Sequence, residues 1–148
     1  MKGFVQDIEK ATEENPDFRR VLYTGRHLQL VVMSLGPGEE IGEEIHHDRD
    51  QFFRVEKGRG EIWIDGVCTK LKSDDAVLVP AGARHNVINR GKRPLKLYTL
   101  YGPPEHRDGV VQSTAAEARA AEEHFDGRIT EQPEPPEEVE QVVPGSPS

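Results

Sequence analysis

The sequence predicts an all-β fold, either a sandwich or a closed barrel. Short β-prone segments recur at even spacing between residues 18 and 102, and Gly, Pro and Asp separate them. No amphipathic helical segment intervenes, which argues against alternating strands and helices. A chain of 148 residues supports one domain with a single core rather than two.

The elements are expected in a simple order. Residues 4–14 are expected to form a short helix at the entrance to the sheet. A β-rich region follows, in which Asp65-Gly66 favours a two-residue hairpin turn. Asp74-Asp75 and residues 90–93 mark further turns. The expected strands are residues 27–35, 41–47, 51–56, 61–65, 67–71, 76–79, 85–89 and 95–101.

The C-terminal part has a different composition. Ser113 or Thr114 can cap a helix, and Glu117 stands three residues after Thr114, as a capping box requires. Alanines favour the helix and Gly127 ends it. Residues 132–148, QPEPPEEVEQVVPGSPS, are expected to be a disordered Pro- and Glu-rich acidic tail. The sequence thus predicts a barrel over 1–112, a peripheral helix over 113–131 and a tail over 132–148.

The charge distribution excludes several function classes. The formal net charge is −8, and residues 113–148 hold nine acids against two bases. The rest of the chain is nearly neutral, so a nucleic-acid-binding surface is not expected. No apolar run approaches the roughly 20 residues of a membrane helix, and acids stand where a signal peptide would be apolar. Cys68 is the only cysteine, which excludes an intrachain disulfide and a Cys-rich zinc site. A cytoplasmic protein without nucleic-acid or membrane partners is expected.

Metal-ligating residue types gather in two segments, 37–60 and 74–89. Glu44 and His46 alternate along one predicted strand and therefore share a face. Gln51 begins the next strand, and His85 begins a later strand after a Pro-x-Gly turn. If the sheet closes, these four side chains converge inside the barrel. Two imidazoles, a carboxylate and an amide oxygen suit one divalent transition metal, such as Mn, Fe, Zn, Ni or Co.

The first segment resembles the first sequence motif of the cupins. That motif is a Gly, five residues, His-x-His, three or four residues, Glu, six residues and a Gly. The corresponding positions here, at matching spacing, are Gly38, Glu44-Ile45-His46, Gln51 and Gly58. Glu44 thus replaces the first family His, and Gln51 replaces the family Glu.

The second segment resembles the second cupin motif, which is a Gly, five residues, Pro-x-Gly, two residues, His, three residues and Asn. Only the leading Gly differs, and the corresponding positions are Asp74, Pro80, Gly82, His85 and Asn89. The resemblance implies a small single-domain cupin, a double-stranded β-helix or jelly-roll barrel. It implies a metal site made of Glu44, His46, Gln51 and His85.

Which of the two adjacent histidines faces inward is left open by the pattern, because only one of them can do so. If His47 is the ligand, Ile45 takes the place of the first family His. The spacing from Gly38 favours Glu44 and His46. The cost of burying Glu44 without a metal favours them too.

The ligand set resembles that of the phosphomannose isomerase branch of cupins, with Glu and Gln exchanged. It also contains the two-His, one-carboxylate set of Fe(II) oxygenases. The resemblance implies a metal-dependent enzyme acting on a small sugar-like substrate, as mannose-6-phosphate isomerase does. A metal-dependent dioxygenase and a non-enzymatic small-molecule-binding cupin are the alternatives. No catalytic residue is assigned, and His106 is expected to be an exposed loop residue. A homodimer is expected, because a barrel of this size exposes sheet edges that need covering.

Overall fold

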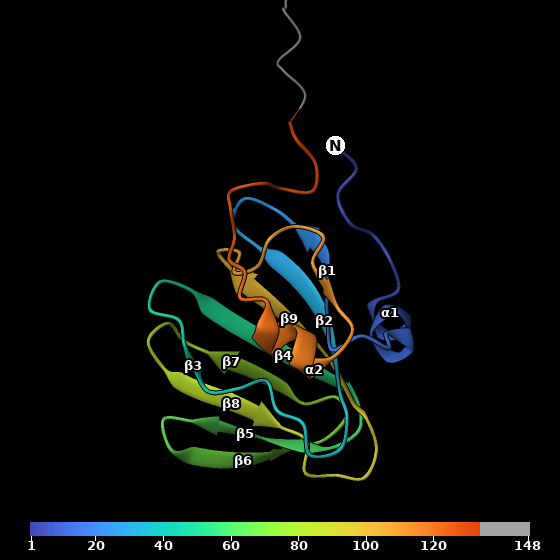
Figure 1. The fold of residues 1–148 in the computed structure, drawn as a ribbon, viewed down its shortest axis with the longest axis vertical. Helices are drawn as coiled ribbons and strands as arrows, with labels where there is room; N and C mark the ends of the chain where they lie inside the picture. The colour runs from blue at the N-terminus through green and yellow to red at the C-terminus, as the bar shows by residue number, and fades with distance from the viewer. Residues whose placement is uncertain (134–148) are drawn as a thin grey trace, which may run out of the picture.

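The strands form two antiparallel sheets that face each other in a cupin β-barrel (Figure 1). In this computed structural model, residues 1–133 are described. The larger sheet has the strand order β10-β1-β2-β9-β4-β7, and the smaller has the order β3-β8-β5-β6. The strands are β1 (Arg19–Thr24), β2 (Gln29–Leu35), β3 (Glu44–Ile45), β4 (Asp50–Lys57), β5 (Gly60–Ile64), β6 (Val67–Leu71), β7 (Ala76–Val79), β8 (Arg84–Ile88), β9 (Leu95–Gly102) and β10 (Val111–Gln112).

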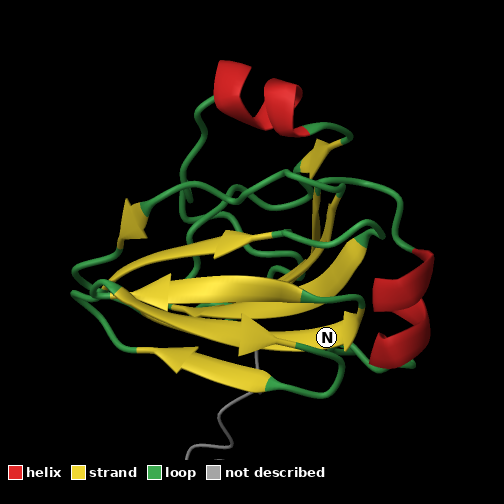
Figure 2. Cartoon of the chain, turned by 90° about the horizontal axis from the view of Figure 1, so that it is seen from below, coloured by secondary structure: helices red, strands yellow, loops and turns green. Residues whose placement is uncertain are grey.

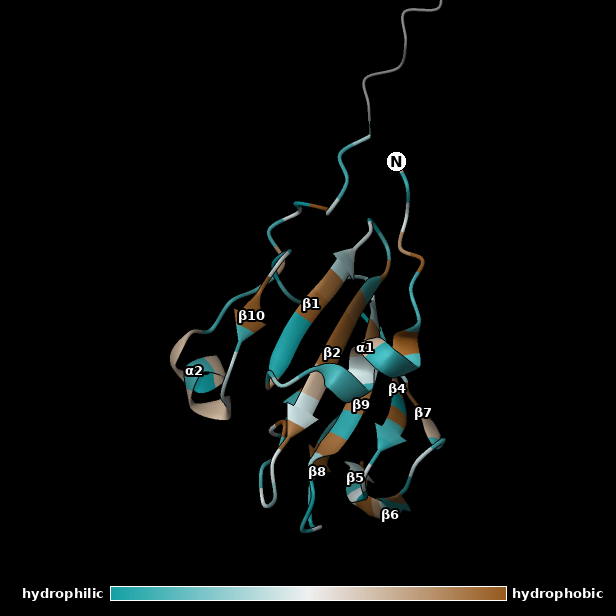
Figure 3. Cartoon of the chain, turned by 90° about the vertical axis from the view of Figure 1, so that its right-hand side faces the viewer, coloured by the Kyte–Doolittle hydropathy of each residue, from teal (hydrophilic) through white to brown (hydrophobic). Residues whose placement is uncertain are grey.

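The core lies between the two sheets, because alternate residues of each strand point inward. Strand β9 alternates between buried and half-buried residues along its whole length. Strand β2 is hydrophobic over most of its length (Figure 3). The inward-facing side chains include Val31, Met33, Leu35, Phe53, Val55, Ile62, Val87, Leu95 and Leu97.

Two short helices lie at separate edges of the strand layers (Figure 2). Helix α1 (Ile8–Glu14) contacts β2, β4 and β9 and begins at Asp7, whose carboxylate accepts from Lys10 N. Helix α2 (Ala115–Ala120) has the expected capping box, in which Thr114 Oγ1 accepts from Glu117 N. The Glu117 carboxylate accepts in return from Ser113 N at 2.9 Å. No helix among residues 1–133 is long and apolar enough to span a membrane.

The all-β prediction and the C-terminal helix are confirmed, but three strands differ from expectation. The sequence reading missed β1 and the two-residue β10. The strand expected over residues 41–47 shrinks to Glu44–Ile45. Gly42 has a φ of 109°, and its N–H donates to the side chain of Asn86. Extended backbone cannot continue through that conformation. Most of the expected acidic tail, residues 134–148, lies outside the described residues.

Two turns that the sequence predicted, at Asp65-Gly66 and at Asp74, adopt left-handed backbone conformations. Asp65 and Gly66 have φ values of 46° and 81°, as a type I′ hairpin requires. Asp74, which replaces the leading Gly of the second cupin motif, has a φ of 75°. Aspartate tolerates this region better than most residues, so the turn survives the departure from the motif.

Candidate metal centre

Three metal-ligating side chains meet at one end of the barrel. Glu44 on β3 is the register partner of His85 on β8, and His46 follows β3 directly. One ligand atom from each lies within 4.8 Å of the others. The two imidazole rings have centroids 5.3 Å apart. His85 is 3% exposed, so its ring faces the interior. This His/Glu cluster could bind a metal ion.

Gln51, at the start of β4, lies beside His85. Its Oε1 is 3.0 Å from His85 Nε2, and its Nε2 donates to Thr99 Oγ1. His85 Nδ1 faces the carbonyl of Ala83 at 3.1 Å. In a neutral imidazole that donates from Nδ1, Nε2 carries a lone pair. The lone pairs of His85 Nε2 and Gln51 Oε1 then face each other, and one cation bound by both atoms would satisfy them.

Glu44 and His46 form a second close pair, with the same spacing as Gln51 and His85. Glu44 Oε2 lies 3.0 Å from His46 Nε2. Two ligands at about 2.1 Å from one ion, at a right angle to each other, are about 3.0 Å apart. Both close pairs of the cluster therefore fit adjacent positions on one divalent ion. The mixed nitrogen and oxygen donor set suits a borderline transition metal.

The structure distinguishes the two adjacent histidines. His47 is exposed, whereas the side chain of His46 is 11% exposed and packs beside His85. The Nδ1 of His46 lies 3.6 Å from Glu105 Oε2. At this distance Glu105 stands beside the ring without a strong hydrogen bond to it. His46 is thus the histidine that joins Glu44 and His85.

The electrostatics favour the protonation states that a metal needs. Burial lowers the pKa of His85, and the nearby His46 lowers it further. Burial alone would raise the pKa of Glu44, but the hydrogen bond and charge of His46 outweigh it, and that pKa is lowered. A neutral imidazole and an ionised carboxylate are the metal-binding forms.

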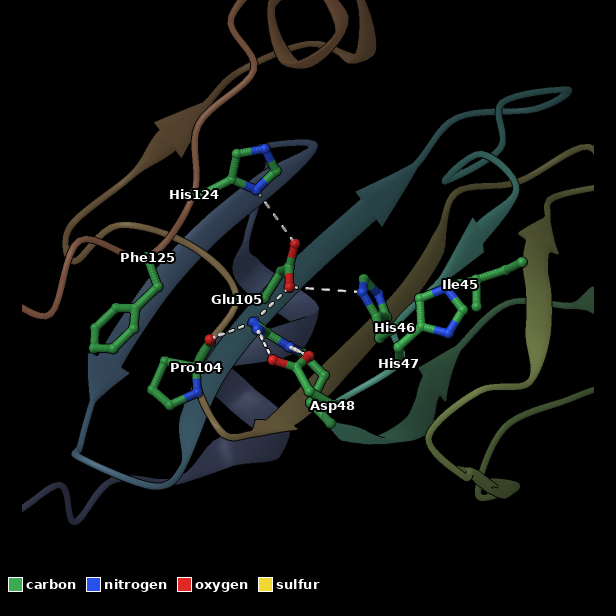
Figure 4. A pocket seen from close by; sticks show the side chains of 9 residues that line it. Ile45, His46, His47, Asp48, Pro104, Glu105, His124 and Phe125 are labelled. Carbon is green, nitrogen blue, oxygen red and sulfur yellow. Dashed lines mark hydrogen bonds and ion pairs between the residues drawn. The ribbon is translucent and has the colours of Figure 1, made fainter.

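An open cavity of about 410 Å³ lies beside this cluster, and His46 is the member of the cluster that lines it. Figure 4 shows Glu105 between His46 and His124, with Phe125 on the wall. Glu105 also accepts from Arg49 Nη1 at 2.6 Å. His124 and Phe125 come from the segment after α2, which the Phe125 N–H to Glu105 carbonyl bond of 2.8 Å fastens to the barrel.

His106 was expected to be exposed, and that expectation is wrong. It is 6% exposed, and its Nε2 lies 3.3 Å from the hydroxyl of Tyr101. Its Nδ1 hydrogen bonds to the carboxylate of Glu123. Burial raises the pKa of Tyr101, so its phenol stays protonated. The hydrogen-bonded series Tyr101, His106 and Glu123 could not be predicted from the sequence, because Glu123 reaches His106 only once the C-terminal segment folds back.

The metal-free protein is expected to lose stability as the pH falls from 7.5 to 5.5. The ordinary pKa of His85 is 6.5 and its folded value is lower, so the unfolded chain takes up a proton first. The stabilisation from neutral His85 is present above about pH 6.5 and is lost as the pH falls toward the folded pKa. Urea midpoints in EDTA measure this. His85→Gln should flatten the profile, and a midpoint that rises toward pH 5.5 would contradict the assignment.

Comparisons with known proteins agree with this geometry. A cupin domain model matches residues 31–101. The uncharacterized protein YrkC of Bacillus subtilis (strain 168) is 49% identical over 128 residues, covering 82% of this chain and 69% of YrkC. The crystal structure of BH2720 from Bacillus halodurans superposes with a TM-score of 0.80 at 48% identity, covering 81% of this chain and 96% of that one.

A more distant relative is an enzyme. Mannose-1-phosphate guanylyltransferase of Escherichia coli (strain K12) is 33% identical over 129 residues. The match covers 75% of this chain but 27% of the enzyme, so it involves about a quarter of that protein. The two cupin motifs, the jelly-roll topology and these relatives agree, and the chain belongs to the cupin family.

Proposed function

We propose that this protein is a metal-dependent enzyme acting on a small sugar-like substrate, in the manner of mannose-6-phosphate isomerase. Its ion would be one divalent transition metal, held by Glu44, His46, Gln51 and His85. The observation that carries the proposal is the meeting of Glu44, His46 and His85, with Gln51 beside His85, next to an open cavity that His46 and further acid–base groups line.

Isomerisation of a sugar moves a proton between adjacent carbons, and it therefore needs a base beside the metal. A bound ion would polarise a carbonyl or hydroxyl oxygen of the substrate. Glu105 is best placed to exchange the proton, because its carboxylate lines the cavity 3.6 Å from His46. Arg49 and His124 hold that carboxylate from two sides. Phe125 supplies an apolar wall that limits the approach of water.

The guanylyltransferase of Escherichia coli supports the sugar class of substrate, since its name records a sugar phosphate. Because only about a quarter of that enzyme is matched, its nucleotidyl transfer is not carried over. The region that matches between the two proteins is about the size of one cupin domain.

A second candidate is a metal-dependent dioxygenase. Glu44, His46 and His85 by themselves form the two-histidine, one-carboxylate set, which leaves ion positions open for substrate and O₂. Gln51 favours the first candidate, because it adds a fourth protein donor and reduces the open positions.

The deciding experiment is metal analysis followed by assays with the metal found. Untagged protein is analysed by elemental mass spectrometry and then reconstituted separately with Mn, Fe, Co, Ni and Zn. Interconversion of aldose and ketose phosphates is followed by NMR, and oxygen uptake is followed by electrode. Isomerisation supports the proposal, oxygen consumption selects the dioxygenase, and binding without turnover selects the non-enzymatic cupin.

The protein is expected to be a homodimer in solution, paired through the outer face of the larger sheet. Phe52 and Tyr98 pack together there with ring centroids 6.2 Å apart and planes tilted by 39°. Leu78, the register partner of Phe52, is 71% exposed. Leu78→Glu should convert the dimer to a monomer in light scattering, because a buried carboxylate is costly. Val67→Glu, at an equally exposed site on the smaller sheet, should leave the dimer intact. A monomeric wild type would refute the interface.

A further inference from the structure

A second cavity, of about 780 Å³, lies where the turns after β4, β6 and β8 meet. Its lining is strongly basic, and no carboxylate side chain contributes to it. The cationic residues are Lys57, Arg59, Lys72, Lys92, Arg93 and Lys96.

This basic pocket lies at the end of the barrel opposite the candidate metal centre. Strand β4 carries Gln51, its second residue, near the metal cluster and ends with Lys57 at the basic pocket. Six residues of extended chain separate them, which is about 20 Å. Strand β9 runs the other way, from Lys96 in the pocket to Tyr101 beside His46. The two sites therefore lie too far apart to share one small ligand.

The positive charges of the pocket are not neutralised by neighbouring acids. Within residues 1–133, none of the six makes an ion pair within 4.0 Å. Two acids in the turn after β6 have other partners: Asp74 pairs with Arg54, and Asp75 accepts from the backbone N–H of Lys72 rather than from its ammonium. Lys57 and Lys96 are direct register partners, an arrangement that destabilises a sheet.

The pKa of Lys96 responds to its burial and to the positive charge of its neighbour Lys57. Burial lowers the pKa of Lys96, and the charge of Lys57 lowers it further. The Lys96 ammonium also donates to the carbonyl of Asn15 at 2.6 Å, which leaves the other five cations exposed. A fold that keeps unpaired like charges together carries a cost that an anionic ligand would remove.

The pocket walls are held in place by the fold. Gly58 has a φ of 92°, and a Cβ there would lie 2.4 Å from the Pro94 carbonyl oxygen, so only glycine permits this close approach. Asn89 donates to the carbonyls of Leu35 and Arg93 and accepts from Gly91 N. These bonds fix the turn between β8 and β9. The cavity is thus preorganised for a ligand.

We propose that the basic pocket binds a small compound carrying two or more phosphate groups. Lysine and arginine donate charge-assisted hydrogen bonds to phosphate oxygens. Pro94 and the methylene stems of the lysines supply apolar surface beside them. The volume of about 780 Å³ lies within the usual range for small-molecule sites.

The surrounding charge selects a small anion over a nucleic acid. Residues 1–133 hold 19 Lys+Arg and 23 Asp+Glu, a net −4, so they carry a formal −10 once these six charges are set aside. A long polyanion that leaves the pocket meets this repulsion, whereas a small one is contained within it.

Titration calorimetry with inorganic tripolyphosphate tests the proposal, at about 50 mM salt and in EDTA. The wild type should bind one equivalent. Lys57→Gln combined with Arg93→Gln should weaken binding by about a hundredfold, since each lost charge-assisted bond is worth about tenfold. Arg26→Gln combined with Lys70→Gln removes the same charge from exposed sites outside the pocket and should change the affinity less than twofold.

The proposal would be overturned by no binding of about millimolar tripolyphosphate to the wild type, by equal weakening in both double variants, or by tighter binding of a single-stranded oligonucleotide than of tripolyphosphate. Glu44→Gln should bind tripolyphosphate as the wild type does. Loss of binding in that variant would place the anion at the metal centre instead, whatever reaction the metal centre performs.

Discussion

His85→Ala is expected to reduce bound metal from about one ion per chain to less than about a tenth. The substitution removes a buried nitrogen ligand whose Nδ1 is fixed by the Ala83 carbonyl. It also leaves Gln51 Oε1 without its close neighbour. Elemental mass spectrometry of the dialysed protein measures the loss. Because bound metal stabilises only the folded state, the holo-protein midpoint should fall to that of the metal-free wild type.

His47→Ala is the matched control, because His47 is also a histidine of this region but is exposed. It should keep a full equivalent of metal. Circular dichroism should show native β structure in both variants, which separates ligand loss from misfolding. A full equivalent of metal in His85→Ala would rule out the four-residue site.

Glu105→Gln is expected to lower turnover by about 10²- to 10⁴-fold, the usual contribution of a general base, while metal content stays near one ion per chain. The amide keeps the shape of the side chain but cannot accept a proton. The contact with His46 is 3.6 Å, too long for a strong hydrogen bond, so the ring should stay in place. Steady-state kinetics of sugar-phosphate isomerisation, with metal analysis of the same sample, separates the two effects.

Glu43→Gln provides the control for that variant. Its carboxylate side chain is 59% exposed and pairs with Arg84 on the surface, away from the cavity lining. Turnover should stay within about twofold of the wild type. An unchanged kcat in Glu105→Gln would remove Glu105 from the chemistry, and loss of metal would assign it to ion binding instead.

The fold and the convergence of Glu44, His46 and His85 could be predicted from the sequence because their signals are local. Alternation places Glu44 and His46 on one face, and turn chemistry at Asp65-Gly66 fixes a hairpin register. The strand expected over 41–47 was too long because the conformation of Gly42 depends on its bond to Asn86, which is distant in sequence.

The rest of the site depends on contacts that no short pattern contains. Glu123 meets His106 across 17 residues of chain, and His124 reaches Glu105 across a similar distance. The basic pocket likewise draws on three turns whose lysines and arginines are scattered from residue 57 to residue 96. The overall composition gives no indication of this basic pocket, because the chain as a whole is acidic.

The segment after α2 that carries His124 and Phe125 has an evolutionary consequence. The side chains of the candidate metal centre are anchored in paired strands and their turns, where a single substitution disturbs a ladder of hydrogen bonds. The wall of the cavity beside them is partly built by the segment after α2, outside those strands. Insertions and substitutions in such a segment are tolerated far more easily. Substitutions in a few C-terminal residues would therefore reshape the cavity wall and leave the Glu44, His46 and His85 cluster in place.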